Sequence, residues 1–253
     1  KDLYSFCADE ETHNKFYDEV DRAYMRIYQR LGLGDCTYKT YASGGAFSKY
    51  SHEFQTLTPI GEDTIYLNQD KTIAVNEEVM NDEVLHDLGA KREDFTATTA
   101  AEVGNIFTLR YKFSEPIGLK FDDQDGARKT VFMGSYGIGV SRVMGVIAEK
   151  FADEKGLVWP ENIAPFKYYV IGIGDQGEDL ARELHQKHSK NVLLDDRNLR
   201  PGEKFTDAEL MGIPYRVVVS DKTLEDDSAE ITDRKTGETK NISIQELKQL
   251  LSD

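Results

Sequence analysis

The stretch from Phe132 to Phe151, FMGSYGIGVSRVMGVIAEKF, combines glycines and an arginine in a way that suits phosphate chemistry. Gly134, Gly137 and Gly139 have no side chain that would keep a flat ligand or a phosphate chain away from the backbone of a strand. Arg142 falls in the first turn of the helix that we expect next, where free N–H groups and the helix dipole favour an anion. A guanidinium adds a forked donor to such a site. The pattern suits a nucleoside triphosphate.

The same spacing allows a second interpretation. A strand relieved by glycines could pack under a neighbouring helix, with a solvated arginine beyond it. On the expected helix, Arg142 points away from an apolar stripe, because successive residues turn by about 100°. The residues of that stripe are Val140, Val143, Met144, Ile147 and Phe151. Spacing alone does not decide between the two interpretations.

The composition is that of a packed globular protein. The chain has 253 residues, of which 39% are hydrophobic, enough for one large domain or two modest ones. Its net charge of −15 argues against binding nucleic acid through bulk charge, so any such contact must be local. Two cysteines without metal spacing indicate a reducing compartment, and no apolar run is long enough to span a membrane. We expect a cytoplasmic protein.

The elements that must position this stretch form an α+β arrangement around an antiparallel sheet. A long amphipathic helix is expected from Asp9 to Leu31, with an apolar stripe made of Phe16, Val20, Ala23, Ile27 and Leu31. Segments rich in Thr, Tyr and Phe predict two strands joined by a loop at Gly44-Gly45. Further strands are expected at DTIYLN, EVGNIFTLRYKFSE and TVFMGSYGIGV, the last two joined by the loop DDQDGARK. Residues 76–99 read as a polar connection with some helical character.

A domain boundary is expected at KGLVWPENIAPF, where Gly156, Pro160 and Pro165 interrupt all periodicity. We therefore expect domains at residues 1–160 and 161–253. The second alternates apolar strands with helices: YYVIGIG, GEDLARELHQKH, NVLLDD, GEKFTDAELMG and PYRVVVSD. A hairpin turning at Thr236-Gly237 and a helix near Ser243 follow. This pattern is typical of a small α/β domain with a mixed sheet.

The stretch MGSYGIGVSR resembles motif 3 of class II aminoacyl-tRNA synthetases, and more narrowly that of the bacterial-type prolyl-tRNA synthetases. Other blocks resemble the same family in the same order. They are KDLYSF (the end of motif 2), SHEFQ (the proline-pocket strand), EVGNIF (the strand before motif 3), WPENIAPF (the junction) and LLDDRNLRPGEKFTDAELMGIPYRVVV (the anticodon-binding domain). The resemblance implies an incomplete class II catalytic domain followed by a small anticodon-binding domain.

The resemblance also implies roles for residues in the ATP site. Arg142 would hold the γ-phosphate, and the glycine strand would form the floor of the adenine pocket. Glu102 would hold Mg²⁺ on the phosphates, since hard oxygen ligands suit that ion; as a bare strand residue it could equally be a solvated glutamate. Arg142 and Glu102 are thus the expected catalytic residues. The full expected ATP set is Gly134, Ser135, Gly137, Gly139, Arg142 and Glu102.

The proline site is implied to lie on the neighbouring strands. His52 and Glu53 alternate across a strand, so they face opposite sides of the sheet. Alone they would more often be ordinary surface residues. The resemblance places His52 and Phe54 beside the proline ring. The full expected proline set is His52, Phe54, Gly104, Asn105 and Ser135.

The anticodon site is implied to lie in DDRNLRPGEKFTDAEL, whose charges alone would indicate a solvated face. Single-stranded bases are read through their edges, for which arginines and carboxylates are both suitable. The expected readers are Asp196, Arg197, Arg200, Phe205 and Glu209. Phe205 could equally be a core residue.

The sequence departs from the family in three respects. Motif 1, the start of motif 2 and the loop that binds the proline amine have no counterpart, so we expect a C-terminal fragment that alone binds ATP weakly and activates proline negligibly. There is no room between Glu78 and Glu102 for an editing domain, which suggests correction of mischarged alanine by a separate protein. Ser135 and Asn105 stand where cysteine and histidine are common in the family.

The function implied is ATP-dependent and Mg²⁺-dependent activation of L-proline and its transfer to tRNA(Pro), by a parent protein that is a homodimer without membrane contact. One rival is a catalytically silent, synthetase-like module that binds tRNA. A weaker rival is an enzyme of the same class that uses threonine or histidine.

Overall fold

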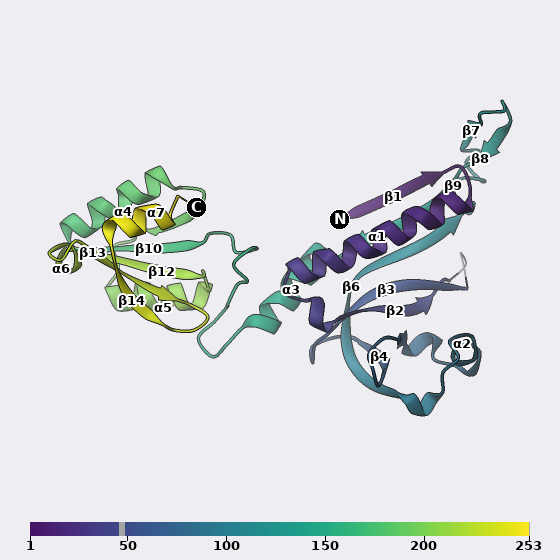
Figure 1. Cartoon of the computed structure of the whole chain (residues 1–253), viewed down its shortest axis with the longest axis horizontal. Helices are drawn as coiled ribbons and strands as arrows, with labels where there is room; N and C mark the ends of the chain where they lie inside the picture. Colours follow the sequence, from purple (N-terminus) through teal and green to yellow (C-terminus); the bar gives the residue numbers. More distant parts are fainter. Residues whose placement is uncertain (46–48, 253) are drawn as a thin grey trace. The chain divides into compact units, whose positions relative to one another are not determined.

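The computed structural model describes residues 1–45 and 49–252. The chain divides into two compact units, Lys1–Ile147 and Ala148–Asp253, each with its own sheet (Figure 1). None of the helices in the described ranges has both the length and the apolar character needed to cross a bilayer.

A seven-stranded sheet with the order β1-β9-β6-β3-β2-β5-β4 frames the N-terminal unit. Its strands are β1 (Asp2–Cys7), β2 (Thr37–Ser43), β3 (Tyr50–Leu57), β4 (Asp63–Asn68), β5 (Ala74–Asn76), β6 (Phe95–Arg110) and β9 (Phe132–Ile138). Every pairing is antiparallel except β2 with β5. The predicted antiparallel sheet is confirmed.

Strand β6 organises this sheet because its 16 residues pair with three partners. Its first part pairs with β4, its middle with β3 and its last part with β9. The pairings β6–β3–β2–β5–β4–β6 therefore close into a ring. The expected strand began only at Glu102, so the expected polar connection was wrong over residues 95–99, which belong to β6.

The smaller elements fill in the connections. The expected strands on either side of Gly44-Gly45 are confirmed as β2 and β3, whereas the expected loop includes residues 46–48, which lie outside the described residues. The expected loop DDQDGARK forms the hairpin of β7 (Lys120–Asp122) and β8 (Arg128–Thr130). A short helix, α2 (Asp82–Asp87), lies between β5 and β6.

Helix α1 (Glu10–Arg30) confirms the long N-terminal helix, capped by Asp9, whose side chain accepts from the N–H of Thr12. Its buried face differs from the expected stripe. The residues it buries are His13, Val20, Tyr24 and Tyr28. The two tyrosine rings pack on Phe54, with centroids 5.2 and 5.5 Å away. The buried face of the helix therefore includes aromatic positions that the predicted aliphatic stripe did not contain.

Helix α3 (Val140–Phe151) follows β9 and begins where we expected it. It buries Val143, Val146 and Ile147, whereas Val140 is 61% exposed and Met144 is 57% exposed. The expected stripe was therefore wrong at Val140 and Met144. The buried three share one narrow face of the helix, and Arg142 still lies off it.

A five-stranded sheet with the order β11-β10-β12-β13-β14 frames the C-terminal unit. Strands β10 (Tyr168–Ile173), β11 (Val192–Asp195) and β12 (Tyr215–Ser220) are parallel, and β13 (Ser228–Asp233) and β14 (Thr239–Ser243) add an antiparallel hairpin. Helices α4 (Asp175–Lys187) and α7 (Ile244–Leu250) share a core on one face, and α5 (Pro201–Met211) packs on the other (Figure 1). The short α6 (Asp221–Leu224) follows β12. The expected α/β domain with a mixed sheet is confirmed.

Candidate functional site

A cleft of about 390 Å³ lies in the N-terminal unit, where β6, β9 and the start of α3 meet. Strand β1 contributes its first residues to the rim. The sheet register explains the convergence, because Asn105 on β6 lies opposite Gly137 on β9. The cleft brings together seven residues expected from the sequence: Glu102, Gly104, Asn105, Ser135, Gly137, Gly139 and Arg142.

Arg142 is anchored at the edge of the cleft with about half of its side chain exposed. Its Nη1 donates to the main-chain oxygen of Glu102 at 2.8 Å and lies 3.5 Å from Oε2 of that residue. Its Nη2 lies 3.3 Å from Oε1 of Glu62, which is itself well exposed. A guanidinium has five N–H donors in a fixed fork, so these contacts leave donor capacity for an anion in the cleft.

Glu102 offers a carboxylate to the same cleft. Its Oε1 accepts from Nδ2 of Asn105 at 2.9 Å, which fixes the orientation of both side chains. In residues 1–45 and 49–252 no group of three or more His, Cys, Asp or Glu side chains is placed to hold a metal ion. Mg²⁺ in nucleotide sites usually takes one or two carboxylates and fills its shell with phosphate oxygens and water. The donor set fits an ion of that kind, carried by phosphates, rather than an all-protein metal centre.

His52 and Phe54 do not lie with these residues. Both project from β3 toward α1, where Phe54 is fully buried against Tyr24 and Tyr28. His52 approaches Tyr17 of α1, with 2.7 Å between Nδ1 and the tyrosine hydroxyl. The structure thus separates the expected proline set, because strand alternation puts these two side chains on the face opposite the cleft.

Glu53 of β3 faces the side of the sheet that bears the cleft, whereas the sequence reasoning chose its neighbour His52. Its Oε2 accepts from Nε2 of Gln55 at 2.9 Å and from Nδ2 of Asn76 at 3.1 Å. Burial, and to a lesser degree the nearby charge of Glu102, raises the pKa of Glu53. Alternation along β3 shows that Glu53 faces away from Phe54, but the sequence did not show which face the long helix would cover.

Gly134 also lies on the α1 side of the sheet. A side chain added there would meet the hydroxyl of Tyr136 at 2.4 Å, the ring of His13 at 2.6 Å and the hydroxyl of Ser5 at 2.8 Å. At Gly139 the nearest atoms would be 3.4 Å away or more, and at Gly137 only the side chain of Asn105 comes near. Of the three glycines in the expected ATP set, Gly137 and Gly139 border the cleft and Gly134 permits close packing.

In the C-terminal unit, Arg197 forms ion pairs with two aspartates and so connects the end of β11 to α5. It lies 2.7 Å from Oδ2 of Asp195 and 2.8 Å from Oδ2 of Asp207. The carboxyl group of Asp195 is buried and also accepts from the hydroxyl of Tyr169 at 2.6 Å. Burial alone would raise the pKa of Asp195, but the hydrogen bonds from Arg197 and Tyr169 outweigh it and lower that pKa to about 2.

The other expected RNA contacts are divided between loop and helix. Asp196 and Arg200 are exposed before and at the start of α5. Phe205 is partly buried against the core beneath α5, and Glu209 lies one turn further along. The guanidinium of Arg216 lies over the Phe205 ring at 4.7 Å. Arg216, which the sequence reasoning missed, has a buried Nε–H without a hydrogen-bond partner in the described structure; the signal was a charge in the apolar strand PYRVVV.

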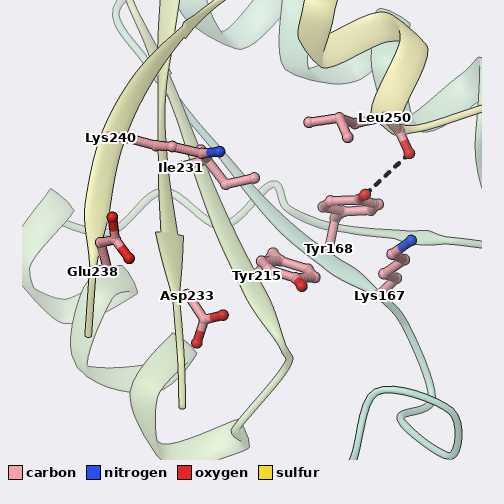
Figure 2. A pocket seen from close by; sticks show the side chains of 8 residues that line it. All are labelled: Lys167, Tyr168, Tyr215, Ile231, Asp233, Glu238, Lys240 and Leu250. Atoms are coloured by element: carbon pink, nitrogen blue, oxygen red, sulfur yellow. Dashed lines mark hydrogen bonds between the residues drawn. The ribbon is translucent and has the colours of Figure 1, made fainter. Parts of the chain in front are cut away.

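A second hollow, of about 310 Å³, opens on the side of the C-terminal sheet opposite α5 (Figure 2). Tyr168 and Tyr215 stack along it with centroids 5.5 Å apart, and the Tyr168 hydroxyl donates to the main-chain oxygen of Leu250. Lys167 and Lys240 project at its sides. None of the catalytic or binding residues expected from the sequence lines this hollow.

Two family models match the chain. The model described as "tRNA synthetase class II core domain (G, H, P, S and T)" matches residues 1–151, and the model described as "Anticodon binding domain" matches residues 167–253. The first covers more than half of the chain. The chain therefore belongs to the class II tRNA synthetases of this group, and the fold class expected from the sequence is confirmed.

Within that family, three relatives of this chain are each named "Proline--tRNA ligase", which confirms the predicted resemblance. The one from Anaplasma phagocytophilum (strain HZ) is 34% identical over 271 residues, covering 99% of this chain and 63% of its own length. Those from Wolbachia sp. subsp. Drosophila simulans (strain wRi) and Phenylobacterium zucineum (strain HLK1) are each 33% identical, covering 97% and 96% of this chain. The chain spans between 61% and 63% of the length of these three relatives.

Proposed function

We propose that the chain supplies the nucleotide site and the anticodon-binding surface of an enzyme that activates L-proline with ATP and transfers it to tRNA(Pro). The observation that carries the proposal is the cleft in which Arg142 and Glu102 converge beside the bare backbone of Gly137 and Gly139. Relatives named for proline and a matching anticodon-binding domain supply the choice of amino acid and RNA.

The chemistry of the first step explains why the cleft needs no nucleophilic side chain. The carboxylate of proline attacks the α-phosphorus of ATP, so a C–O–P link forms and pyrophosphate leaves. Catalysis then consists of holding the reactants in line and neutralising the charge that gathers on the phosphates. In this chain Arg142 provides the positive charge. A Mg²⁺ ion held in part by Glu102 would supply further charge on the phosphates when bound.

Arg142 can bind a phosphate while keeping its hydrogen bond to the main chain of Glu102. Its hydrogen bond to the main-chain oxygen of Glu102 uses an acceptor that does not titrate or move away. Its contact with Glu62 is an exposed ion pair, and such pairs contribute little to stability. A phosphate oxygen would therefore displace Glu62 while Glu102 continues to aim the guanidinium.

Adenine would lie against the backbone of Gly137 and Gly139, bordered by the side chain of Asn105 near Gly137 and by that of Arg142 near Gly139. We place the amino acid over Asn105 and Ser135, next to the backbone of Gly104, with Glu53 at the border of its pocket. His52 and Phe54 support that pocket from the other face of β3. In the C-terminal unit, Asp196, Arg200, Phe205 and Glu209 are the proposed anticodon contacts, and Arg197 acts by fixing the loop ahead of α5.

Binding of adenylate analogues tests the proposal directly. Non-hydrolysable prolyl and threonyl adenylates are titrated into the purified chain, and gel shifts with tRNA(Pro) are measured in parallel. We expect tRNA binding and at least a tenfold preference for the prolyl analogue, since a misfit of the amino acid is worth about 1–3 kcal/mol. Binding of tRNA without either analogue would favour a silent tRNA-binding module, and a threonyl preference would favour another enzyme of the class. The proposal includes a homodimeric parent protein that works in the cytoplasm, as the family resemblance implies.

A further inference from the structure

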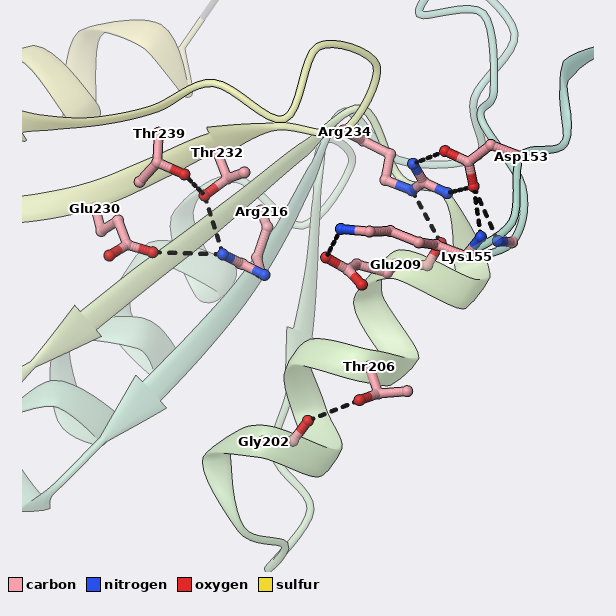
Figure 3. Close-up of polar contacts among 11 residues, drawn as sticks. Asp153, Lys155, Gly202, Thr206, Glu209, Arg216, Glu230, Thr232, Arg234 and Thr239 are labelled. Carbon is pink, nitrogen blue, oxygen red and sulfur yellow. Dashed lines mark hydrogen bonds and ion pairs between the residues drawn. The ribbon is translucent and has the colours of Figure 1, made fainter.

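The segment that follows α3 is fastened to the end of α5 (Figure 3). The N–H of Leu157 donates to the oxygen of Leu210 at 3.1 Å, and Trp159 donates to the oxygen of Gly212 at 3.2 Å. The indole Nε1 of Trp159 also donates to the oxygen of Met211. The last turn of α5 therefore has its carbonyl groups satisfied by this segment, which we call the connector (residues 153–159).

Two glycines bring the two backbones into direct contact. A side chain at Gly156, which has φ of +144°, would lie 2.5 Å from the Cα of Leu210. A side chain at Gly212, which has φ of +71°, would lie 2.0 Å from the oxygen of Leu157. No larger residue fits at either position without moving main chain, so the packing here is specified by the sequence.

Arg234 ties the connector to α5 with all three of its donor groups (Figure 3). Its Nη1 and Nη2 each donate to a different oxygen of Asp153 at 2.6 Å, and its Nε donates to the main-chain oxygen of Glu209 at 2.9 Å. Its side chain is only 7% exposed. Asp153 also accepts from the N–H groups of Lys155 and Gly156, so its orientation is fixed from both sides.

Glu209 is the residue on which these contacts meet. Arg234 binds its main chain, and Nζ of Lys155 lies 2.9 Å from its carboxylate. One helical turn earlier, Phe205 stacks with Arg216. The contacts thus fix the part of α5 that carries two of the proposed anticodon contacts.

We propose that Asp153 and Arg234 are positioning residues for RNA recognition by α5. They touch no base themselves. They hold the main chain of Glu209 so that its carboxylate meets the edge of a guanine at hydrogen-bonding distance, after that guanine displaces Lys155. This inference rests on the proposed function, because it takes Glu209 to be an anticodon contact.

Base discrimination is the property that such positioning should control. Phosphate contacts supply much of the affinity for RNA whatever its sequence, whereas edge contacts distinguish bases and depend on accurate geometry. If the end of α5 were less firmly held, the preference between RNA sequences would therefore fall before the overall affinity for RNA did. A merely structural role would lower stability and leave the ratio of affinities unchanged.

The experiment compares two RNA stem-loops bound to the full 253-residue chain. One carries the proline anticodon loop, and in the other both guanines that pair with the proline codon are replaced by cytosine. The variants are Asp153→Asn, which keeps the turn contacts but weakens the two-pronged pair, and Arg234→Lys, which keeps the charge. The matched control is Lys187→Met, which breaks a 2.6 Å ion pair with Glu183 on α4. Dissociation constants are measured below the unfolding temperature of every variant.

We expect the unsubstituted chain to prefer the proline loop, and both variants to reduce that preference by about tenfold, the worth of one good edge contact. The control should keep the full preference. Variants that keep it, or that bind both loops more weakly by an equal factor, would overturn the positioning role alone. An unsubstituted chain that does not distinguish the loops would overturn anticodon reading by this surface, and the present inference with it. The two failures differ because the second is seen before any substitution is made.

Discussion

The guanidinium of Arg142 donates a 2.8 Å hydrogen bond to the main-chain oxygen of Glu102, while the carboxylate of the same residue lies 3.5 Å away. Glu102 of β6 thus holds Arg142, in the first turn of α3, through its main-chain oxygen. Its carboxylate offsets the charge of the guanidinium. The backbone contact persists whatever occupies the cleft. The side-chain contact can be exchanged for phosphate or shared with a cation.

Arg142→Gln should weaken ATP binding by about ten- to a hundredfold, because a hydrogen bond to a charged group contributes about 1.5–3 kcal/mol. Calorimetric titration of ATP with Mg²⁺ into the chain measures this. Lys150→Gln on the same helix removes an equal charge away from the cleft, and it should leave the dissociation constant within twofold. Equal weakening by both substitutions would mean that only net charge matters.

Gly134→Ala and Gly139→Ala should differ in stability although both glycines lie on or next to β9. At Gly134 the added methyl group would collide with His13 and Tyr136, so we expect a loss of about 1–3 kcal/mol in the free energy of unfolding. At Gly139 the nearest atom is Cβ of Arg142 at 3.4 Å, and the change should stay within about 0.5 kcal/mol. Urea unfolding of the two variants provides the comparison, and the reverse order would contradict the assigned faces.

Gly145→Ala should stabilise the N-terminal unit. Gly145 lies inside α3, is exposed, and has no atom within 4 Å of the place that a side chain would take. Alanine is favoured over glycine in a helix by about 0.8–1.0 kcal/mol, chiefly because glycine loses more backbone entropy. Thermal unfolding should show a higher midpoint with unchanged ATP affinity. A lower midpoint would show that the glycine has a packing role at this position.

His52 should make the stability of the chain fall on acidification. Burial, and then the charge of Lys39, lowers its pKa to about 3 in the folded state, whereas an unfolded histidine titrates near 6.5. Between about pH 6.5 and pH 3 only the unfolded chain binds this proton, so the free energy of unfolding decreases as the pH falls through that window. The slope from this group is at most about 1.4 kcal/mol per pH unit.

The comparison with His52→Gln isolates that slope. Chemical denaturation at several pH values should show a shallower acid loss for the variant than for the unsubstituted chain. Parallel curves for the two proteins would mean that His52 titrates normally in the folded state. Other groups titrate in the same range, but they contribute equally to both proteins.

Local patterns predicted most of the elements. Asp9 and Gly32 bound the first helix as capping rules require, and the polar turn at Thr236-Gly237 joins β13 to β14. The spacing of Gly137, Gly139 and Arg142 suggested a ligand site without excluding simple packing, and these residues do line a cleft. Such features depend on residues close together in the chain.

The side of a strand or helix that becomes buried was harder to predict, because it depends on packing partners far away in the sequence. Alternation along β3 separates Glu53 from Phe54, but only the tyrosines of α1 decide that Phe54 is covered. His13 of the same helix packs against Gly134, so that no side chain fits there. Likewise, the link of Asp153 to Arg234 joins residues 81 positions apart, and neither residue type is unusual in a loop. Long-range packing of this kind leaves no periodic trace.

The pairing of β1 with β9 has a consequence for biosynthesis. The register joins Cys7 to Phe132, so the sheet cannot be finished until some 125 further residues have been translated, which takes roughly 6–25 s at ordinary rates. The ring of β2 to β6, by contrast, lies wholly within residues 37–110 and can assemble earlier. The polypeptide emerging from the ribosome thus carries the ring of β2 to β6 already formed, beside an unpaired strand whose Ser5 and Cys7, buried in the finished fold, are still exposed, and this interval is when a chaperone would be of most use.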